Sequence, residues 1–138
     1  MNNNKIAGSC LCGEITFQFV GPINVFQYCH CSRCQKVTGS AHASNIIIDP
    51  EQFTWLSGEE LLGRFEMPNT KHFATTFCKN CGSYLPWLTQ SGKAFIIPAG
   101  SLDDDPNVRP IHNIFYTDKA PWHESIDDLI KYDGLPTK

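Results

Sequence analysis

The chain lacks the long hydrophobic run that a membrane-spanning helix requires. Its longest apolar runs, such as 45–48 and 94–97, are far too short to cross a bilayer, and the N-terminus lacks the apolar stretch of a secretory signal. No cluster of lysine or arginine stands out among 138 residues of net charge −3, although phosphate binding needs a basic face. We therefore expect no membrane partner, no nucleic-acid partner and a cytoplasmic location.

Helical patterns are also scarce. One short helix is predicted at 33–38, ended by Gly39, and a second at 125–132, where Ser-x-x-Asp resembles a capping box. Strand patterns dominate, and 14–20 alternates with Ile15, Phe17 and Phe19 on one face. Further short strands are predicted between turn-forming residues, at 44–48, 53–56, 64–66, 72–77 (through Phe73, Thr75 and Phe77), 94–98 and 111–117.

No internal repeat, linker or low-complexity tract interrupts the chain. A hydrophobic fraction of 41% and a charged fraction of 18% are typical of a folded globular protein, and the length suits one modest core. We expect a mainly β, single-domain fold of short antiparallel strands over residues 1–138, built around metal sites and with little helix.

Cysteine, by contrast, is abundant and clustered. Closely spaced cysteines favour a shared metal ion, whereas disulfides join distant loops and are rare in the cytoplasm. The odd number of cysteines also argues against a complete disulfide framework. The seven fall into three groups: Cys10 and Cys12; Cys29, Cys31 and Cys34; Cys78 and Cys81.

The first and last groups are predicted to share one ion. Cys10 and Cys12 would face the same way if they lie on an extended strand, and Cys78-x-x-Cys81 forms a turn with a second pair. Each pair is followed by glycine, which tolerates positive φ. Four thiolates make a closed tetrahedral site, so we expect structural zinc that joins segments separated by 65 residues.

The middle group offers only three sulfurs within six residues. Cys29 and Cys31 are expected to alternate on a strand, and Cys31-x-x-Cys34 closes a turn. The fourth position must come from a histidine, a carboxylate, a water or a substrate, and an exchangeable position is the usual layout of catalytic zinc. Three thiolates make the ion a better match for soft ligands, which favours a sulfur-bearing substrate.

An alternative is that a histidine completes the middle site and makes it structural too. The candidates are His30, His42, His72, His112 and His123, although His30 lies between two ligands and should point away from the ion. A redox-inert tetrahedral thiolate site favours zinc over iron.

Other polar features carry less information. Arg33 and Lys36 either attract an anionic substrate to the middle site or are exposed helix-face charges. Residues 103–105, three aspartates before a proline, are predicted to form a solvated turn. Three tryptophans are expected in the core or at its rim: Trp55, Trp87 and Trp122.

The motifs around these cysteines resemble a known family. The chain is similar to the glutathione-dependent formaldehyde-activating (centromere protein V-like) family over about 8–136. The resemblance is carried by Gly-Ser-Cys-Leu-Cys-Gly-Glu-Ile at 8–15, Tyr-Cys-His-Cys-Ser-Arg-Cys-Gln-Lys-Val-Thr-Gly-Ser at 28–40, Phe-Cys-Lys-Asn-Cys-Gly-Ser at 77–83, Ala-Gly-Ser-Leu-Asp-Asp at 99–104, Pro-Trp at 121–122 and Asp-Gly-Leu-Pro at 133–136.

The resemblance implies a β-tent fold with two zinc ions (Zn²⁺) per chain. The founding activity of the family is the condensation of formaldehyde with glutathione to S-hydroxymethylglutathione, classed as a carbon–sulfur lyase. By this resemblance, structural zinc binds Cys10, Cys12, Cys78 and Cys81, and catalytic zinc binds Cys29, Cys31 and Cys34.

Two functions follow from the sequence. The first is a zinc-dependent carbon–sulfur lyase that acts on a small aldehyde or thiol adduct, with glutathione as one candidate partner. The second is a non-catalytic zinc-binding module that docks a protein partner or senses metal or thiol status. The occupant of the fourth position at the middle site discriminates between them.

Overall fold

The computed structural model describes residues 4–124 and 128–136. Of these, 37% lie in strands and 15% in helical turns, which confirms a mainly β fold with little helix. None of the helices in these two ranges is long and apolar enough to span a bilayer.

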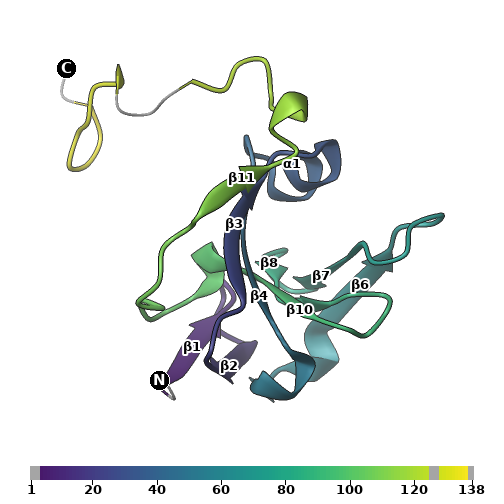
Figure 1. The fold of residues 1–138 in the computed structure, drawn as a ribbon. Helices are drawn as coiled ribbons and strands as arrows, with labels where there is room; N and C mark the ends of the chain where they lie inside the picture. Colours follow the sequence, from purple (N-terminus) through teal and green to yellow (C-terminus); the bar gives the residue numbers. More distant parts are fainter. Residues whose placement is uncertain (1–3, 125–127, 137–138) are drawn as a thin grey trace.

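The strands form three small sheets (Figure 1). All paired strands are antiparallel except β11 and β3, which are parallel. The first sheet, β1-β2-β5, contains β1 (Lys5–Ser9), β2 (Thr16–Val20) and β5 (Phe53–Ser57). The second, β11-β3-β4-β10-β9, contains β11 (His112–Ile114), β3 (Val25–Cys29), β4 (Ala43–Ile48), β10 (Phe95–Pro98) and β9 (Trp87–Leu88). The third, β6-β7-β8, contains β6 (Leu62–Glu66), β7 (Ala74–Cys78) and β8 (Tyr84–Leu85).

Within the residues that the structure describes, helical structure is limited to short segments. α1 confirms the predicted helix, and it ends at Gly39, whose φ of 63° is the left-handed conformation expected of a glycine cap. In Figure 1, α1 sits at one end of β3 and β4, far from the first sheet. The segments are α1 (Ser32–Thr38) and four 3₁₀ turns, η1 (Pro50–Gln52), η2 (Glu59–Leu61), η3 (Ala99–Ser101) and η4 (Tyr116–Asp118).

Residues of all three sheets form the main hydrophobic core. Ile15, Phe17 and Phe19 are fully buried, which confirms the alternation predicted for β2. They pack in one cluster with Ile46 and Ile48 of β4. Burial of each such side chain contributes about 1.5–3 kcal/mol, so this cluster is a major source of stability.

The prediction that Phe73, Thr75 and Phe77 form the buried face of the strand at 72–77 is wrong for β7. Thr76 and Cys78 are buried there, whereas Phe77 is 38% exposed. The Phe77 ring lies over Gly63 of the paired strand, where the missing side chain leaves room for it. The ring is therefore sheltered by a glycine on the outer side of the sheet, which the alternation of apolar residues does not reveal.

The C-terminal predictions also need correction. The strand predicted at 111–117 is only three residues long, because Phe115 adopts a left-handed φ of 53° and begins η4. Of the helix predicted at 125–132, residues 125–127 lie outside the described residues, and 128–132 form no α-helix. Trp122 is 65% exposed and so lies in neither core nor rim, in a segment that Figure 1 shows leading away from the sheets.

The aspartate turn at 103–105 is bonded to the first sheet rather than simply solvated. Asp103 accepts a hydrogen bond of 2.9 Å from the Ser9 hydroxyl, and Asp104 accepts one of 2.8 Å from the amide of Ala7. These contacts hold the loop after β10 against the edge of β1.

Candidate functional site

Four cysteine sulfurs meet where the first and third sheets adjoin. Cys10 and Cys12 lie in the turn after β1, while Cys78 ends β7 and Cys81 lies in the following turn. All four sulfurs are within 4.8 Å of one another. The pair at the N-terminal end was predicted on a strand, but β1 ends at Ser9 and a turn brings the two sulfurs together.

The spacing of these sulfurs suits a tetrahedral ion. The sulfurs of Cys10 and Cys12 are 3.5 Å apart, and those of Cys12 and Cys78 are 3.9 Å apart. Zinc–sulfur bonds of about 2.3 Å give a tetrahedron with edges of about 3.8 Å. The four residues, which we call the quartet, therefore fit a thiophilic metal ion.

Backbone and hydroxyl donors surround the quartet. The amide of Ile15 donates to the Cys10 sulfur at 3.3 Å, and that of Cys12 donates to the Cys81 sulfur at 3.4 Å. The hydrogen bond from the Ser83 hydroxyl is the main reason why the pKa of Cys81 is lowered to about 5, whereas burial raises the pKa of Cys78 to about 11. Such donors stabilise thiolate charge beside a bound cation.

Three further sulfurs meet at the end of the second sheet. Cys29 is the last residue of β3, and Cys31 is the N-cap of α1, whose sulfur accepts from the Cys34 amide at 3.4 Å. All three sulfurs lie within 4.8 Å of one another. The strand predicted through Cys31 is therefore wrong: the strand stops, and the first turn of the helix delivers two of the three sulfurs. We call these residues the trio.

The thiols of the trio oppose one another's ionisation. A hydrogen bond from Cys34 is the main cause that lowers the pKa of Cys29 to about 6. The same hydrogen bond and then burial raise the pKa of Cys34 far above its usual value. Because three sulfurs lie within 4.8 Å of one another, the donor set fits a cation that compensates their negative charge.

The histidines of the described residues stay outside both cysteine groups. His30 is fully buried and its Nε2 donates to Asn113 Oδ1 at 2.8 Å, while its ring lies 5.0 Å from that of His42. His72 contacts Ser91. Burial lowers the pKa of His42. Across 4–124 and 128–136, no imidazole nitrogen or carboxylate oxygen joins the quartet or the trio.

A cavity of about 680 Å³ opens beside the trio. It lies on one face of the second sheet, and its volume is in the range of small-molecule sites. All three sulfur residues line it, together with apolar side chains that sequence reasoning did not single out as a site. The apolar wall consists of Ile47, Phe73, Trp87, Ala94, Ile96 and Ile114.

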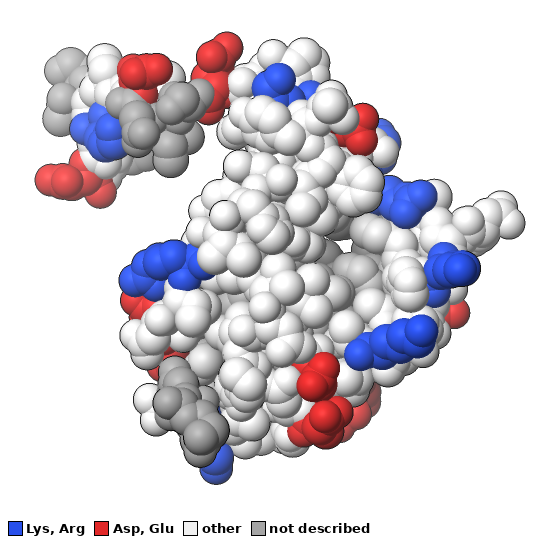
Figure 2. All heavy atoms as spheres, viewed as in Figure 1, with Lys and Arg blue, Asp and Glu red and all other residues white. Residues whose placement is uncertain are grey.

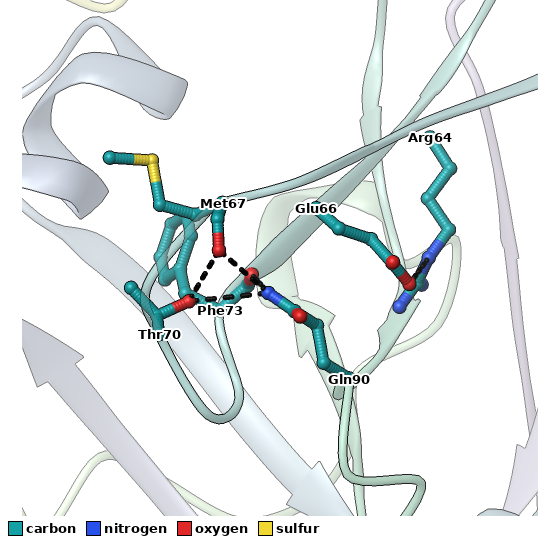
Figure 3. A network of polar contacts seen from close by, with 6 residues as sticks. All are labelled: Arg64, Glu66, Met67, Thr70, Phe73 and Gln90. Carbon is teal, nitrogen blue, oxygen red and sulfur yellow. Dashed lines mark hydrogen bonds and ion pairs between the residues drawn. The ribbon is translucent and has the colours of Figure 1, made fainter.

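Hydrogen bonds hold two residues of this apolar wall, Trp87 and Phe73, in place. The Trp87 indole donates to the Tyr84 hydroxyl at 2.7 Å. Phe73 ends the loop between β6 and β7, and Gln90 donates to the carbonyl oxygens of Met67, at 3.0 Å, and of Phe73 (Figure 3). No local pattern reveals this, because Gln90 follows Phe73 by 17 residues.

Charge lies at the edge of the cavity. Arg33 lines it, with its guanidinium 5.7 Å from the centre of the Phe73 ring, and Lys93 lines it on another side, whereas Lys36 does not. In the view of Figure 2 the middle of the molecule is mostly uncharged, and most charged side chains lie toward its edges. Of the two interpretations left open for Arg33 and Lys36, a position beside the site therefore fits only the arginine.

Comparison with known proteins identifies the family. The profile of the glutathione-dependent formaldehyde-activating enzyme matches residues 5–118. The fold resembles the crystal structure of a Rhodobacter sphaeroides protein, a Northeast Structural Genomics target, with a TM-score of 0.59 and 19% sequence identity over 78% of this chain and 98% of that chain. No curated protein matches the sequence. Since the family profile covers most of the chain, the protein belongs to the glutathione-dependent formaldehyde-activating enzyme family.

Proposed function

We propose that this protein is a zinc-dependent carbon–sulfur lyase that interconverts a small aldehyde and a thiol with their adduct. The observation that carries the proposal is the trio, a set of three thiolate donors that opens into a cavity of small-molecule size. Family membership supports the reaction class, since the family is named for formaldehyde activation with glutathione.

The two cysteine groups are assigned different roles. The quartet would hold zinc as a closed structural site, because four protein thiolates leave no position for a substrate. Zinc held by Cys29, Cys31 and Cys34 would supply a Lewis acid that makes a thiol ionise at neutral pH.

The reaction requires no oxidant. In the forward direction the thiol sulfur bonds to the carbonyl carbon, the carbon–oxygen double bond becomes single, and the thiol proton ends on that oxygen by way of solvent. The reverse direction breaks the carbon–sulfur bond. Within the cavity, Phe73 and Trp87 would exclude water from the reacting atoms, and Arg33 and Lys93 would attract a carboxylate on the thiol, as glutathione carries.

The cavity also argues against the alternative function, a non-catalytic zinc-binding module. A zinc module that only docks a protein partner needs no hollow beside its metal. A largely apolar hollow with a few charged side chains in its lining, here Arg33, Lys93 and Asp118, is the usual form of a small-molecule site, and it favours an enzyme.

Replacement of Cys31 by serine tests the proposal. We expect Cys31→Ser to bind one zinc per chain instead of two and to lose at least about 100-fold in the rate of formaldehyde–glutathione exchange, since a Lewis acid contributes several kcal/mol. Exchange is measured by magnetisation-transfer NMR, and zinc by elemental analysis. Lys36→Ala, an exposed change on the same helix, is the control and should keep the full rate. An unchanged rate in Cys31→Ser would refute the catalytic role.

A further inference from the structure

Asn45 is a buried polar side chain without a partner. It is 6% exposed, and its Oδ1 accepts no hydrogen bond from the part of the chain that the structure describes. A buried amide oxygen left without a donor is costly, and such atoms are uncommon in folded proteins. This atom therefore points to a donor that comes from outside the chain.

The neighbouring strands do not supply that donor. Gln27 lies directly opposite Asn45 on β3, but its carboxamide oxygen accepts from His112 Nε2 at 2.8 Å and its amide nitrogen makes no hydrogen bond to Asn45 Oδ1. On the other side, Asn45 faces Pro98 of β10, whose nitrogen carries no proton. Asn45 thus lies between two residues that leave its Oδ1 unpaired.

Asn45 lines the same cavity as the trio. Cys29 pairs directly with Ala43, so Asn45 is the diagonal neighbour of Cys29 on the same face of the sheet. Diagonal neighbours have side chains about 7–8 Å apart, which leaves room between them for a sulfur–carbon–oxygen group. Ile47 and Trp87 continue the cavity wall beyond Asn45. Asn45 is therefore a polar group between Cys29 and the part of the apolar wall formed by Ile47 and Trp87.

We propose that Asn45 is a specificity-determining residue that hydrogen-bonds the hydroxyl of an aldehyde–thiol adduct whose thiol carries an apolar body. The inference rests on the proposed function. Addition of a thiol converts the carbonyl oxygen of the aldehyde, an acceptor, into a hydroxyl, a donor. A carboxamide matches both, because by turning about its last bond it presents either its N–H to the carbonyl or its oxygen to the hydroxyl.

Binding of two matched compounds tests the assignment. The first is phenylmethylsulfanylmethanol, formed from phenylmethanethiol with formaldehyde in excess, and the second is benzyl methyl sulfide, which lacks only the hydroxyl. By isothermal titration calorimetry, the unmodified protein should bind the first about tenfold or more tightly than the second, since sites built around a hydroxyl reject analogues without it. In Asn45→Leu and Asn45→Ala this ratio should fall below about threefold.

The ratio of the two affinities distinguishes recognition of the hydroxyl from a general distortion of the cavity. A change that merely distorts the cavity weakens both compounds alike, whereas loss of the amide weakens the hydroxyl compound alone. Ser44→Ala, on the opposite face of the same strand, is the control and should keep the ratio. Should neither Asn45 variant fold, the side-chain ¹⁵N resonance of Asn45 in the unmodified protein should shift with the hydroxyl compound and stay in place with the sulfide; equal shifts would overturn the proposal.

The outcomes distinguish this inference from the proposed function. If the Asn45 variants keep the ratio while the unmodified protein exchanges thiol and aldehyde, the role of Asn45 is wrong and the function stands. If the unmodified protein shows neither exchange nor a preference, both are wrong. A preference that depends on Asn45 without any exchange would support the binding role and remove the catalytic one.

Discussion

At the scale of single residues, two glycines show how close packing is set by the absence of a side chain. A Cβ atom added to Gly8 would lie 2.1 Å from the Phe17 ring, and one added to Gly63 would lie 2.3 Å from the Phe77 ring. The two contacts look alike, but their surroundings differ. Phe17 is fully buried, whereas Phe77 is 38% exposed.

We expect Gly8→Ala to destabilise the protein by about 1–3 kcal/mol, because the Phe17 ring has no free space to move into. Its ring is packed against Phe53 at 5.5 Å and against Trp55 at 5.9 Å. Gly63→Ala should have a smaller effect, since Phe77 can swing toward solvent. Urea unfolding of both variants measures the difference, and equal losses would contradict this account.

The geometry of the trio also depends on single residues. Cys31 is both the N-cap of α1 and a member of the trio, and the same first turn of α1 brings the Cys34 sulfur close to it. Cysteine spacing therefore indicated the correct partners, although the predicted strand conformation was wrong. Two sulfurs at positions i and i+3 converge on a helix turn as readily as in a loop, so the spacing constrains the ligand set more tightly than the backbone.

At the scale of elements, the loop between β6 and β7 carries Phe73 into the cavity wall and is held by a side chain from another part of the chain. Its shape depends on Gln90, whose side-chain N–H groups reach Met67, Thr70 and Phe73 (Figure 3). Because Phe73 lines the cavity, the order of this loop affects ligand binding.

Gln90→Glu should loosen this loop. A carboxylate cannot donate, and it would face carbonyl oxygens, so we expect a loss of about 1–3 kcal/mol in the free energy of unfolding and weaker binding in the cavity. Urea denaturation and the calorimetric titration described above give both quantities. Glu66→Gln is the matched control, because it breaks the exposed ion pair with Arg64 in the same region and should cost less than about 1 kcal/mol. A larger loss in the control than in Gln90→Glu would count against the loop's dependence on Gln90.

At the scale of the whole molecule, the two cysteine groups have different relations to the sheets. The quartet joins the turn of the first sheet to the turn of the third, and the amide of Leu11 donates to Ser83 across the same junction at 2.9 Å. The trio joins only β3 to the helix that follows it. We therefore expect loss of the quartet to weaken the junction between the first and third sheets, and loss of the trio to leave that junction intact.

We expect Cys78→Ser to abolish cooperative unfolding, while Cys31→Ser lowers the melting temperature by only a few degrees. Structural zinc contributes about 10–16 kcal/mol, as much as the whole stability of a typical domain, which is about 5–15 kcal/mol. Differential scanning calorimetry of both variants is the measurement. A cooperative transition in Cys78→Ser close to that of the unmodified protein would show that the quartet is not a structural metal site.

The sequence alone determined the composition of the trio, each close pair within the quartet, the mainly β character and the buried face of β2, because each depends on local spacing or on alternation along a strand; the union of the two pairs followed from the count of seven cysteines and is made by the tertiary structure. The position of Asn45, the support from Gln90 and the inward face of β7 were decided only by tertiary structure. Each of them depends on which strands pair and in which register, and register is set by contacts between residues that are distant in the chain.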